Sequence, residues 1–251
     1  MRSRFLRLLS VLLLALSFGA PGFAQDDQIF TQKQQDALKK LVHDYLMENP
    51  GVIAEAIEAL RAKEDLAADL AAKKVLAERK DEIFNDADSP VVGNPKGDVV
   101  LVEFFDYRCP YCKAMFEQLF DAVKADGKVK LVLKEFPVLG PDSVIASRAA
   151  LAAREQKKYE EFHRAIMRLK EPVTEKVVYK VAGEVGLNVE KLKKDMDDQK
   201  IDNILKNNIR LAHDLDISGT PAFIIGDQLI PGAVSTQSLK QLIDQTRKAK
   251  S

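Results

Sequence analysis

Between residues 31 and 84, apolar side chains recur every three or four positions, a spacing that predicts helices. Asn49-Pro50 separates two of them, because Asn is a good N-cap and Pro is tolerated in the first helical turn. No Gly or Pro occurs from residue 52 to residue 84, so an unbroken second helix would be roughly 50 Å long. One apolar face of the first helix consists of Leu38, Leu41, Val42 and Tyr45.

The second predicted helix carries an apolar stripe that a domain of this size can cover only in part. A partner must cover the remainder, which favours self-association through residues 31–84. The alternative to self-association is that residues 31–60 fold back onto the main domain. Residues 62–77 are rich in alanine and charged side chains and indicate a solvated spacer. The stripe consists of Ile53, Ile57 and Leu60 and continues weakly through Ala67, Ala71 and Val75.

After a break at residues 86–90, short apolar runs alternate with helical spacing. The runs 99–105 and 130–136 flank a predicted helix at 110–125, which indicates a right-handed β-α-β unit with parallel strands. Helical patterns then fill about 142–216. A hairpin across Gly226-Asp227 and a last helix at 236–247 close the chain. This order predicts an α/β thioredoxin fold with a helical insert, preceded by an α-helical arm.

The first residues have the pattern of a secretory signal peptide. Three arginines precede an apolar run at residues 8–18, and Gly22-Phe23-Ala24 offers small residues for cleavage after Ala24. The alternative is a membrane anchor, but the run is shorter than the roughly 20 residues that span a bilayer. We therefore expect a cleaved signal over residues 1–24, a helical oligomerisation arm and linker over 25–85, a thioredoxin-fold domain over 86–251, and no stable membrane insertion.

The net charge and the number of cysteines limit the range of possible functions. Removal of residues 1–24 takes away three arginines and leaves 38 − 3 = 35 basic against 38 acidic residues. This slightly acidic balance argues against a nucleic-acid partner, which usually requires a basic surface. The chain has only two cysteines, Cys109 and Cys112, which lie too close in sequence to staple a fold. An exported protein with this single pair points to redox chemistry with other molecules.

The two cysteines follow a predicted strand and open a predicted helix. A helix N-terminus favours an anion, so the Cys109 thiolate should form easily there and act as the nucleophile. Pro110 suits the first helical turn, and Cys112, one turn further, can close a small disulfide ring as the resolving thiol. We expect Pro110 and Tyr111 to tune this balance.

Gly219-Thr220-Pro221 forms a second candidate site directly before a predicted strand. An X-Pro bond is the one place where a cis peptide is inexpensive. A cis Thr220-Pro221 bond would expose the Thr220 backbone beside the dithiol, where an extended substrate could pair with it. The alternative is an ordinary trans proline in a loop.

The stretch from Phe104 to Cys112, the helical insert and Gly219-Thr220-Pro221 together resemble the DsbA-type thiol:disulfide oxidoreductases of the bacterial periplasm, over roughly residues 89–251. Gly93-Asn94-Pro95 and Phe105-Asp106-Tyr107 are similar to the Com1-like and ScsC branch (suppressor of copper sensitivity protein C). That branch tends to carry an N-terminal helical segment, and members of the ScsC type can trimerise through it and then act as disulfide isomerases.

This resemblance implies a periplasmic, homotrimeric disulfide isomerase that needs no cofactor beyond the Cys109–Cys112 disulfide. Its implied partners are unfolded or misoxidised exported proteins and a membrane thiol-redox protein of the DsbD/ScsB or DsbB type. The pattern also places a buried acid at Glu103, near the resolving thiol, with Lys134 as its basic partner in a proton relay; alternatively the two form a structural ion pair or are solvated. The best-known DsbA enzymes have His where Tyr111 stands, which implies a less oxidising dithiol here.

Other interpretations stay open. The protein could be a monomeric DsbA-type oxidase, a copper-tolerance protein that holds Cu(I) with the two thiols, or a surface protein that uses the fold for binding only. The three histidines have no ligand spacing, so we expect no metal site from them. Three residues could line a peptide groove or pack in the core: Phe136, Val138 and Leu139. The three histidines are His43, His163 and His213.

Overall fold

The computed structural model describes residues 30–249, in two compact units that divide at Glu58 and Ala59. The predicted signal peptide lies outside the described residues. Within residues 30–249, no helix combines the length and the apolar character that a bilayer crossing requires.

The first unit contains helix α1 (Gln32–Glu48) and the start of α2 (Gly51–Glu78), with the break at Asn49-Pro50 that the sequence predicted. The Thr31 N–H donates to the Gln34 side chain at 2.9 Å and so caps the start of α1. No residue of α1 is buried. The predicted apolar face is exposed, with Leu41 at 65 % and Tyr45 at 55 %.

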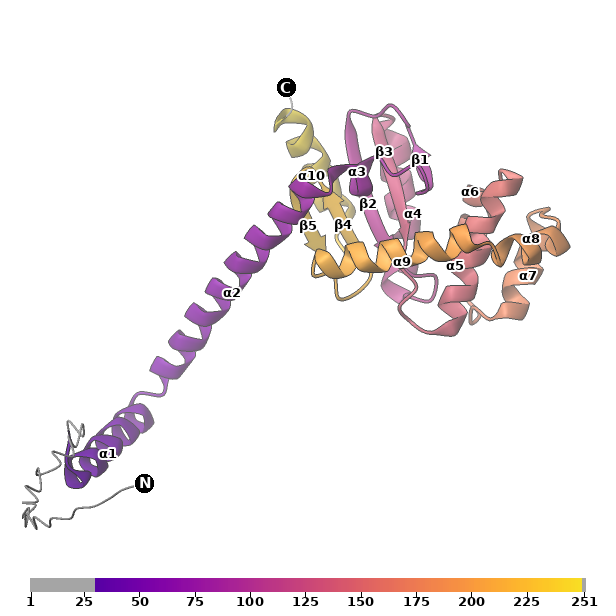
Figure 1. Cartoon of the computed structure of the whole chain (residues 1–251). Coiled ribbons are helices and arrows are strands. Elements are labelled where there is room, and N and C mark those ends of the chain that lie inside the picture. Colours follow the sequence, from indigo (N-terminus) through magenta and orange to yellow (C-terminus); the bar gives the residue numbers. More distant parts are fainter. Residues whose placement is uncertain (1–29, 250–251) are drawn as a thin grey trace, which may run out of the picture. The chain divides into compact units, whose positions relative to one another are not determined.

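The second unit is built around one five-stranded sheet, in the order β1-β3-β2-β4-β5 (Figure 1). Only β2 and β3 run parallel, and the other neighbours are antiparallel. The parallel pair and the hairpin confirm the predicted thioredoxin fold. The strands are β1 (Val91–Gly93), β2 (Val99–Phe105), β3 (Val129–Glu135), β4 (Ala222–Ile225) and β5 (Gln228–Pro231).

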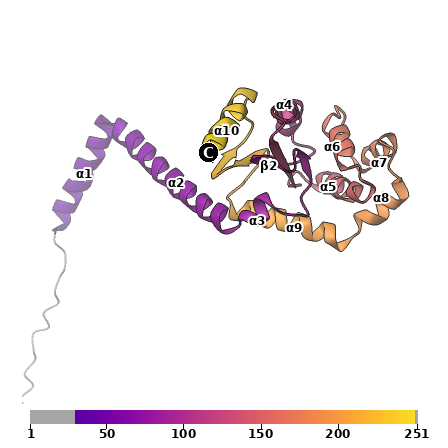
Figure 2. The same cartoon turned by 90° about the horizontal axis from the view of Figure 1, so that it is seen from above.

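Helices cover both faces of the sheet (Figure 2). Odd-numbered residues of β2 and β3 face a core shared with α4 (Pro110–Asp126) and α10 (Thr236–Ala249). Even-numbered residues face a second core shared with α3 (Lys80–Phe84) and α9 (Gln199–Asp214). This division decides which side chains can reach the cysteines.

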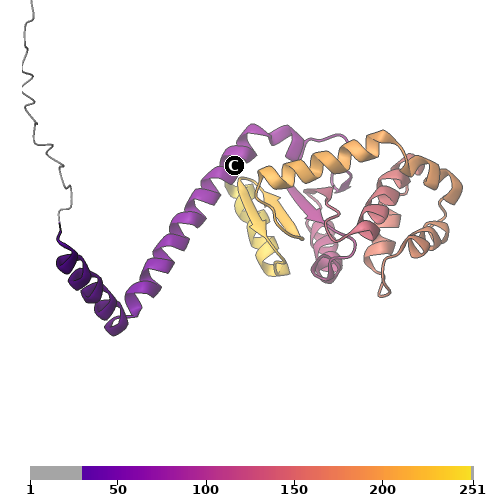
Figure 3. The same ribbon diagram turned by 60° about the horizontal axis from the view of Figure 1, so that its bottom comes forward.

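The helical insert between β3 and β4 packs against the first core. Its last helix, α9, contacts both α5 and β3 and returns the chain to the sheet (Figure 3). The other members of the insert are α5 (Pro141–Ala153), a 3-10 turn (Arg154–Gln156), α6 (Tyr159–Met167), α7 (Glu175–Glu184) and α8 (Val189–Met196).

The domain boundary predicted at residue 85 is wrong. Ile83 and Phe84 of α3 are buried in the second core, and Leu76 near the end of α2 is buried with them. Lys130 also donates to the Phe84 carbonyl at 2.8 Å. The catalytic unit therefore includes the end of α2 and all of α3, because these apolar side chains complete the underside of the sheet.

Candidate functional site

Cys109 occupies the N-cap position of α4, with Pro110 in the first turn as predicted. Its sulfur accepts a hydrogen bond from the Cys112 N–H at 3.3 Å and lies 3.2 Å from the Thr220 carbonyl oxygen, to which it donates only in its protonated form. Both cysteines are free thiols. Cys109 is the more exposed of the two, at 3 % against 0 % for Cys112. The geometry therefore gives the two sulfurs unequal roles.

The two thiols also differ in pKa. A hydrogen bond from the Cys112 thiol, together with bonds from the Thr220 side chain and the helix backbone, outweighs burial and lowers the pKa of Cys109 to about 6. The same shared hydrogen bond raises the pKa of Cys112 far above its ordinary value, and burial and the charge of Glu103 add to this. At neutral pH, Cys109 is a thiolate and Cys112 keeps its proton. A thiolate is the form that attacks a disulfide.

The Thr220–Pro221 peptide bond is cis, as the sequence predicted. It leads directly into β4, whose Ala222 is paired with Phe104 on β2. This pairing explains why the Thr220 carbonyl reaches Cys109 although 111 positions separate them in sequence. Tyr111 is 65 % exposed on the outer side of the motif. An approaching chain would meet Tyr111, Cys109 and the Thr220 backbone together.

Asp106, which the sequence analysis named only as part of the Phe105-Asp106-Tyr107 motif, organises the loops around Cys109. It is fully buried, and Oδ2 accepts from the Val138 and Leu139 N–H groups at 2.9 and 3.0 Å. Oδ1 accepts from the Arg108 N–H at 2.7 Å and the Ser143 hydroxyl at 2.8 Å. One carboxylate thus joins the turn before Cys109 to the loop after β3. An Asp directly after a buried strand was the available sequence signal.

The loop held by Asp106 contains two of the three candidate groove residues. Val138 and Leu139 are 44 % and 43 % exposed. Arg108 donates to the Leu139 carbonyl at 2.6 Å, which fixes this loop beside the cysteine turn. Phe136 instead is buried and packs edge-on against Phe104 at 6.0 Å, so it belongs to the core.

Glu103 lies on the same face of β2 as the cysteines. It is 2 % exposed, and no hydrogen bond or ion pair reaches its carboxyl group from residues 30–249. Burial, the Cys109 charge and Glu135 raise its pKa to about 8. A carboxyl group in this state can hold a proton at neutral pH and exchange it with a nearby thiol.

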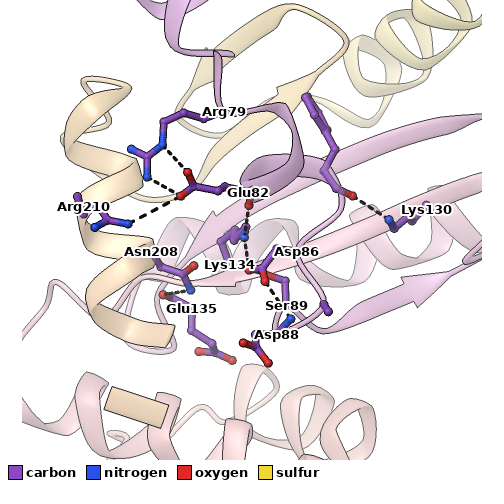
Figure 4. Close-up of polar contacts among 12 residues, drawn as sticks. Arg79, Glu82, Asp86, Asp88, Ser89, Lys130, Lys134, Glu135, Asn208 and Arg210 are labelled. Atoms are coloured by element: carbon purple, nitrogen blue, oxygen red, sulfur yellow. Dashed lines mark hydrogen bonds and ion pairs between the residues drawn. The ribbon is translucent and has the colours of Figure 1, made fainter. Parts of the chain in front are cut away.

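Lys134 is not the partner of Glu103, contrary to prediction. In the parallel register Glu103 aligns with Leu133, while Lys134 aligns with Phe104 and therefore points to the opposite face. There its ammonium donates to Asp86 and to the Glu82 carbonyl, both at 2.7 Å (Figure 4). Lys134 thus anchors α3 and the loop after it beneath the sheet.

A second buried acid, Glu135, was also missed. Tyr107 and Tyr159 donate to it at 3.0 and 2.8 Å, and the Tyr107 hydroxyl lies 2.9 Å from His163 Nδ1. Burial raises the Glu135 pKa to about 8, against the opposing hydrogen bonds, and lowers the His163 pKa to about 3. His163 is therefore a neutral packed side chain beneath the cysteine turn. An acid at the end of an apolar run was the available signal.

The other two histidines are exposed to solvent. The His43 and His213 side chains are 72 % and 89 % exposed. Within residues 30–249, no group of three or more His, Cys, Asp or Glu side chains is placed to hold a metal ion.

Comparison with known proteins agrees with this geometry. Residues 100–244 match the DSBA-like thioredoxin domain family, and residues 34–65 match the copper resistance protein ScsC N-terminal domain. Disulfide bond formation protein D of Bacillus subtilis is 28 % identical over 177 residues, which cover 64 % of this chain and 78 % of that protein. The N-terminal helical region and the thioredoxin domain thus each match a known family.

Solved structures extend the similarity. A thioredoxin-like oxidoreductase from Silicibacter pomeroyi DSS-3 is 45 % identical and superposes with a TM-score of 0.66, covering 67 % of this chain and 97 % of that one. Proteus mirabilis ScsC in a transitional conformation is 30 % identical with a TM-score of 0.65, covering 88 % of this chain and 100 % of that one.

Proposed function

Because the chain belongs to the DsbA-like thioredoxin family, we propose that it exchanges disulfides with exported proteins through Cys109 and Cys112. The observation that carries this proposal is the unequal pair of thiols, one a thiolate at a helix N-cap and the other a buried, protonated thiol. The redox group is the dithiol itself, without a further cofactor.

Reduction of a substrate disulfide takes two steps. The Cys109 thiolate attacks one sulfur of a substrate disulfide, forms a mixed disulfide and releases the other substrate sulfur as a thiolate. Cys112 then attacks the Cys109 sulfur, so the substrate leaves with two thiols and the enzyme keeps the Cys109–Cys112 disulfide. In the mixed disulfide Cys109 carries no charge, so one of the causes that raise the Glu103 pKa is gone, and the ionised fraction of Glu103, or water, takes the proton that Cys112 loses. The reverse sequence oxidises a substrate dithiol.

Isomerisation uses only the first step. The released substrate thiolate attacks a different disulfide within the same substrate, and a substrate thiolate finally expels Cys109 with no net oxidation. This direction requires a reduced enzyme, so we propose a membrane thiol-redox partner that returns electrons to the dithiol.

A periplasmic location is supported by the arginine-led apolar run of residues 1–18 and by a relative of known structure. That relative is a periplasmic thioredoxin-like protein from Salmonella enterica serovar Typhimurium, 31 % identical over 67 % of this chain.

We propose that the arm assembles the protein into a homotrimer in which several dithiols meet one substrate. Residues 34–65 match the ScsC N-terminal domain, and α1 leaves its whole apolar face exposed. Light scattering on the full mature chain tests this proposal. Replacing Leu41 and Tyr45 by Glu should give a monomer, whereas Met47→Glu, on the opposite side of α1, should leave the oligomer intact.

Refolding of scrambled ribonuclease, with insulin reduction as the control, tests the enzyme proposal. The wild type should act in both assays and Cys109→Ser in neither. The monomeric Leu41→Glu/Tyr45→Glu variant should keep insulin reduction and lose most isomerase activity. A monomeric wild type would favour a DsbA-type oxidase. Activity in neither assay would contradict the proposed function.

Copper binding is a second candidate function. The match of residues 34–65 to a copper resistance protein domain favours it, and two cysteine thiolates suit Cu(I). A Cu(I) competition titration with a colorimetric chelator would test it. Stoichiometric binding that disappears in both Cys109→Ser and Cys112→Ser would support the function.

A further inference from the structure

Strand β1 forms one free edge of the sheet. Its register with β3 pairs Val92 with Leu131, and the flanking bonds join Leu133 to the Pro90 carbonyl and Asn94 to the Val129 carbonyl, each at 2.9 Å. In an antiparallel pair, alternate residues turn their backbone groups inward. The N–H and C=O groups of Val91 and Gly93 therefore point away from the sheet, and no hydrogen bond from residues 30–249 satisfies them.

A groove runs beside this edge, between β1 and α6. It consists of two adjoining hollows of about 660 and 320 Å³, which share Glu160 and Arg164 of α6 as a common wall. The first hollow reaches Val91, and the second reaches Gly93. The outward backbone groups of β1 thus open into a space that can accept another chain.

The charge of the groove selects the kind of chain. Arg164 is neutralised by Glu160 at 2.7 Å and lies over the Phe120 ring at 4.4 Å. Lys124 and Lys157 are exposed at opposite ends of the groove and form no ion pair within residues 30–249. The groove carries four basic side chains against two acidic ones: Lys124, Arg154, Lys157 and Arg164 against Glu160 and Glu161.

We propose that the β1 edge is a docking site for an extended acidic segment of a partner protein, which adds to the sheet as a sixth strand. Main-chain bonds to Val91 and Gly93 would hold the segment, and its acidic side chains would face Lys124 and Lys157. Two strands separate this edge from β4, and β3 separates it from β2, which leads into the dithiol. Docking would therefore leave Cys109 free and does not depend on the redox function.

The probe is a fluorescein-labelled eight-residue peptide of alternating Glu and Val, titrated against the full mature chain by fluorescence anisotropy. Lys124→Glu/Lys157→Glu should weaken binding about tenfold, because two favourable exposed ion pairs become repulsive. Lys240→Glu, an exposed charge change on α10, should change affinity less than twofold. Insulin reduction should be equal in both variants and in the wild type.

A second probe separates strand addition from simple charge attraction. A peptide of the same sequence with N-methyl groups on alternate residues keeps its charge and loses the donors that would pair with β1. It should bind at least tenfold more weakly, and hydrogen exchange at residues 90–94 should slow only with the unmethylated peptide. Equal binding of both peptides, or of an eight-nucleotide single-stranded DNA, would overturn the proposal. So would unchanged affinity of the Lys124→Glu/Lys157→Glu variant, which would mean that these lysines only guard the edge.

Discussion

Replacing Glu103 by Gln should stabilise the reduced protein while it impairs the chemistry. Burial raises the pKa of this carboxyl group from 4.5 to about 8, so the folded protein keeps it protonated where the unfolded chain ionises it. An acid with a raised pKa contributes no penalty below pH 4.5, and stability is lost progressively as pH rises from there to about 8. At about 1.4 kcal/mol per pH unit, this cost reaches about 3 kcal/mol at pH 7.

Gln has nearly the shape of a protonated Glu but does not ionise. Glu103→Gln should therefore be about 3 kcal/mol more stable than the wild type at pH 7 and nearly equal to it at pH 4.5. Urea unfolding under reducing conditions at several pH values between 4.5 and 8 measures this difference directly. If the two proteins differ by a constant amount over that range, the carboxyl group is already ionised in the fold and the reasoning fails.

The same substitution removes the proposed proton acceptor of Cys112. Resolution of the mixed disulfide should slow by roughly a hundredfold, the lower end of what positioned acid–base groups contribute. Glu135→Gln is the control for loss of a buried acid, because Glu135 is also buried but is held by the Tyr107 and Tyr159 hydroxyls; it lowers the Glu103 pKa and leaves the acceptor in place. Equal rates for Glu103→Gln and the wild type would exclude a relay through Glu103.

Two further predictions concern the cysteine turn. Alkylation of Cys109 by iodoacetamide should follow a titration with a midpoint near pH 6, while Cys112 in the folded protein stays unmodified at neutral pH. Mass spectrometry distinguishes the two thiols, and a midpoint near the ordinary thiol value would contradict the assigned hydrogen bonds. Asp106→Ala should cost about 4 kcal/mol of unfolding free energy, because four donors lose a buried charged acceptor, and should slow insulin reduction by loosening the 138–139 loop. Asp121→Ala, on the exposed side of α4, is the matched control and should leave both quantities nearly unchanged; an equal loss in the two variants would remove the special role of Asp106.

The sequence predicted the residues of the site better than it predicted the residues that surround them. Two cysteines at a predicted helix start and a proline before a predicted strand sufficed to locate Cys109, Cys112 and Pro221, because each depends on local backbone rules. The cis bond and the N-cap position agree with those rules.

The pairing of Glu103 with Lys134 failed for a reason that lies beyond local sequence. Both strands are covered on both faces, so their apolar runs do not alternate and do not reveal which face a polar residue occupies. Only the register, which aligns Glu103 with Leu133, separates the two side chains. Strand register is a property of the assembled sheet, and a shift by one residue reverses every face.

The boundary at residue 85 failed for a similar reason. Asp86 to Pro90 breaks the helical pattern strongly, but a chain break does not mark the edge of a core. Ile83 and Phe84 are apolar like the stripe of the preceding helix. The neighbouring sequence therefore does not show that they pack against the sheet rather than against a partner. The contact between Lys134 and Asp86 ties this segment to the sheet, and it joins positions 48 residues apart.

Trapping of the mixed disulfide tests the central claim most directly. A Cys112→Ser variant of the full mature chain, incubated with a disulfide-containing peptide, should accumulate a covalent adduct that mass spectrometry assigns to Cys109. Cys109→Ser should give no adduct under the same conditions, because Cys112 is buried and protonated. Equal adducts on both variants, or none on Cys112→Ser, would contradict the account of Cys109 as nucleophile and Cys112 as the resolving thiol.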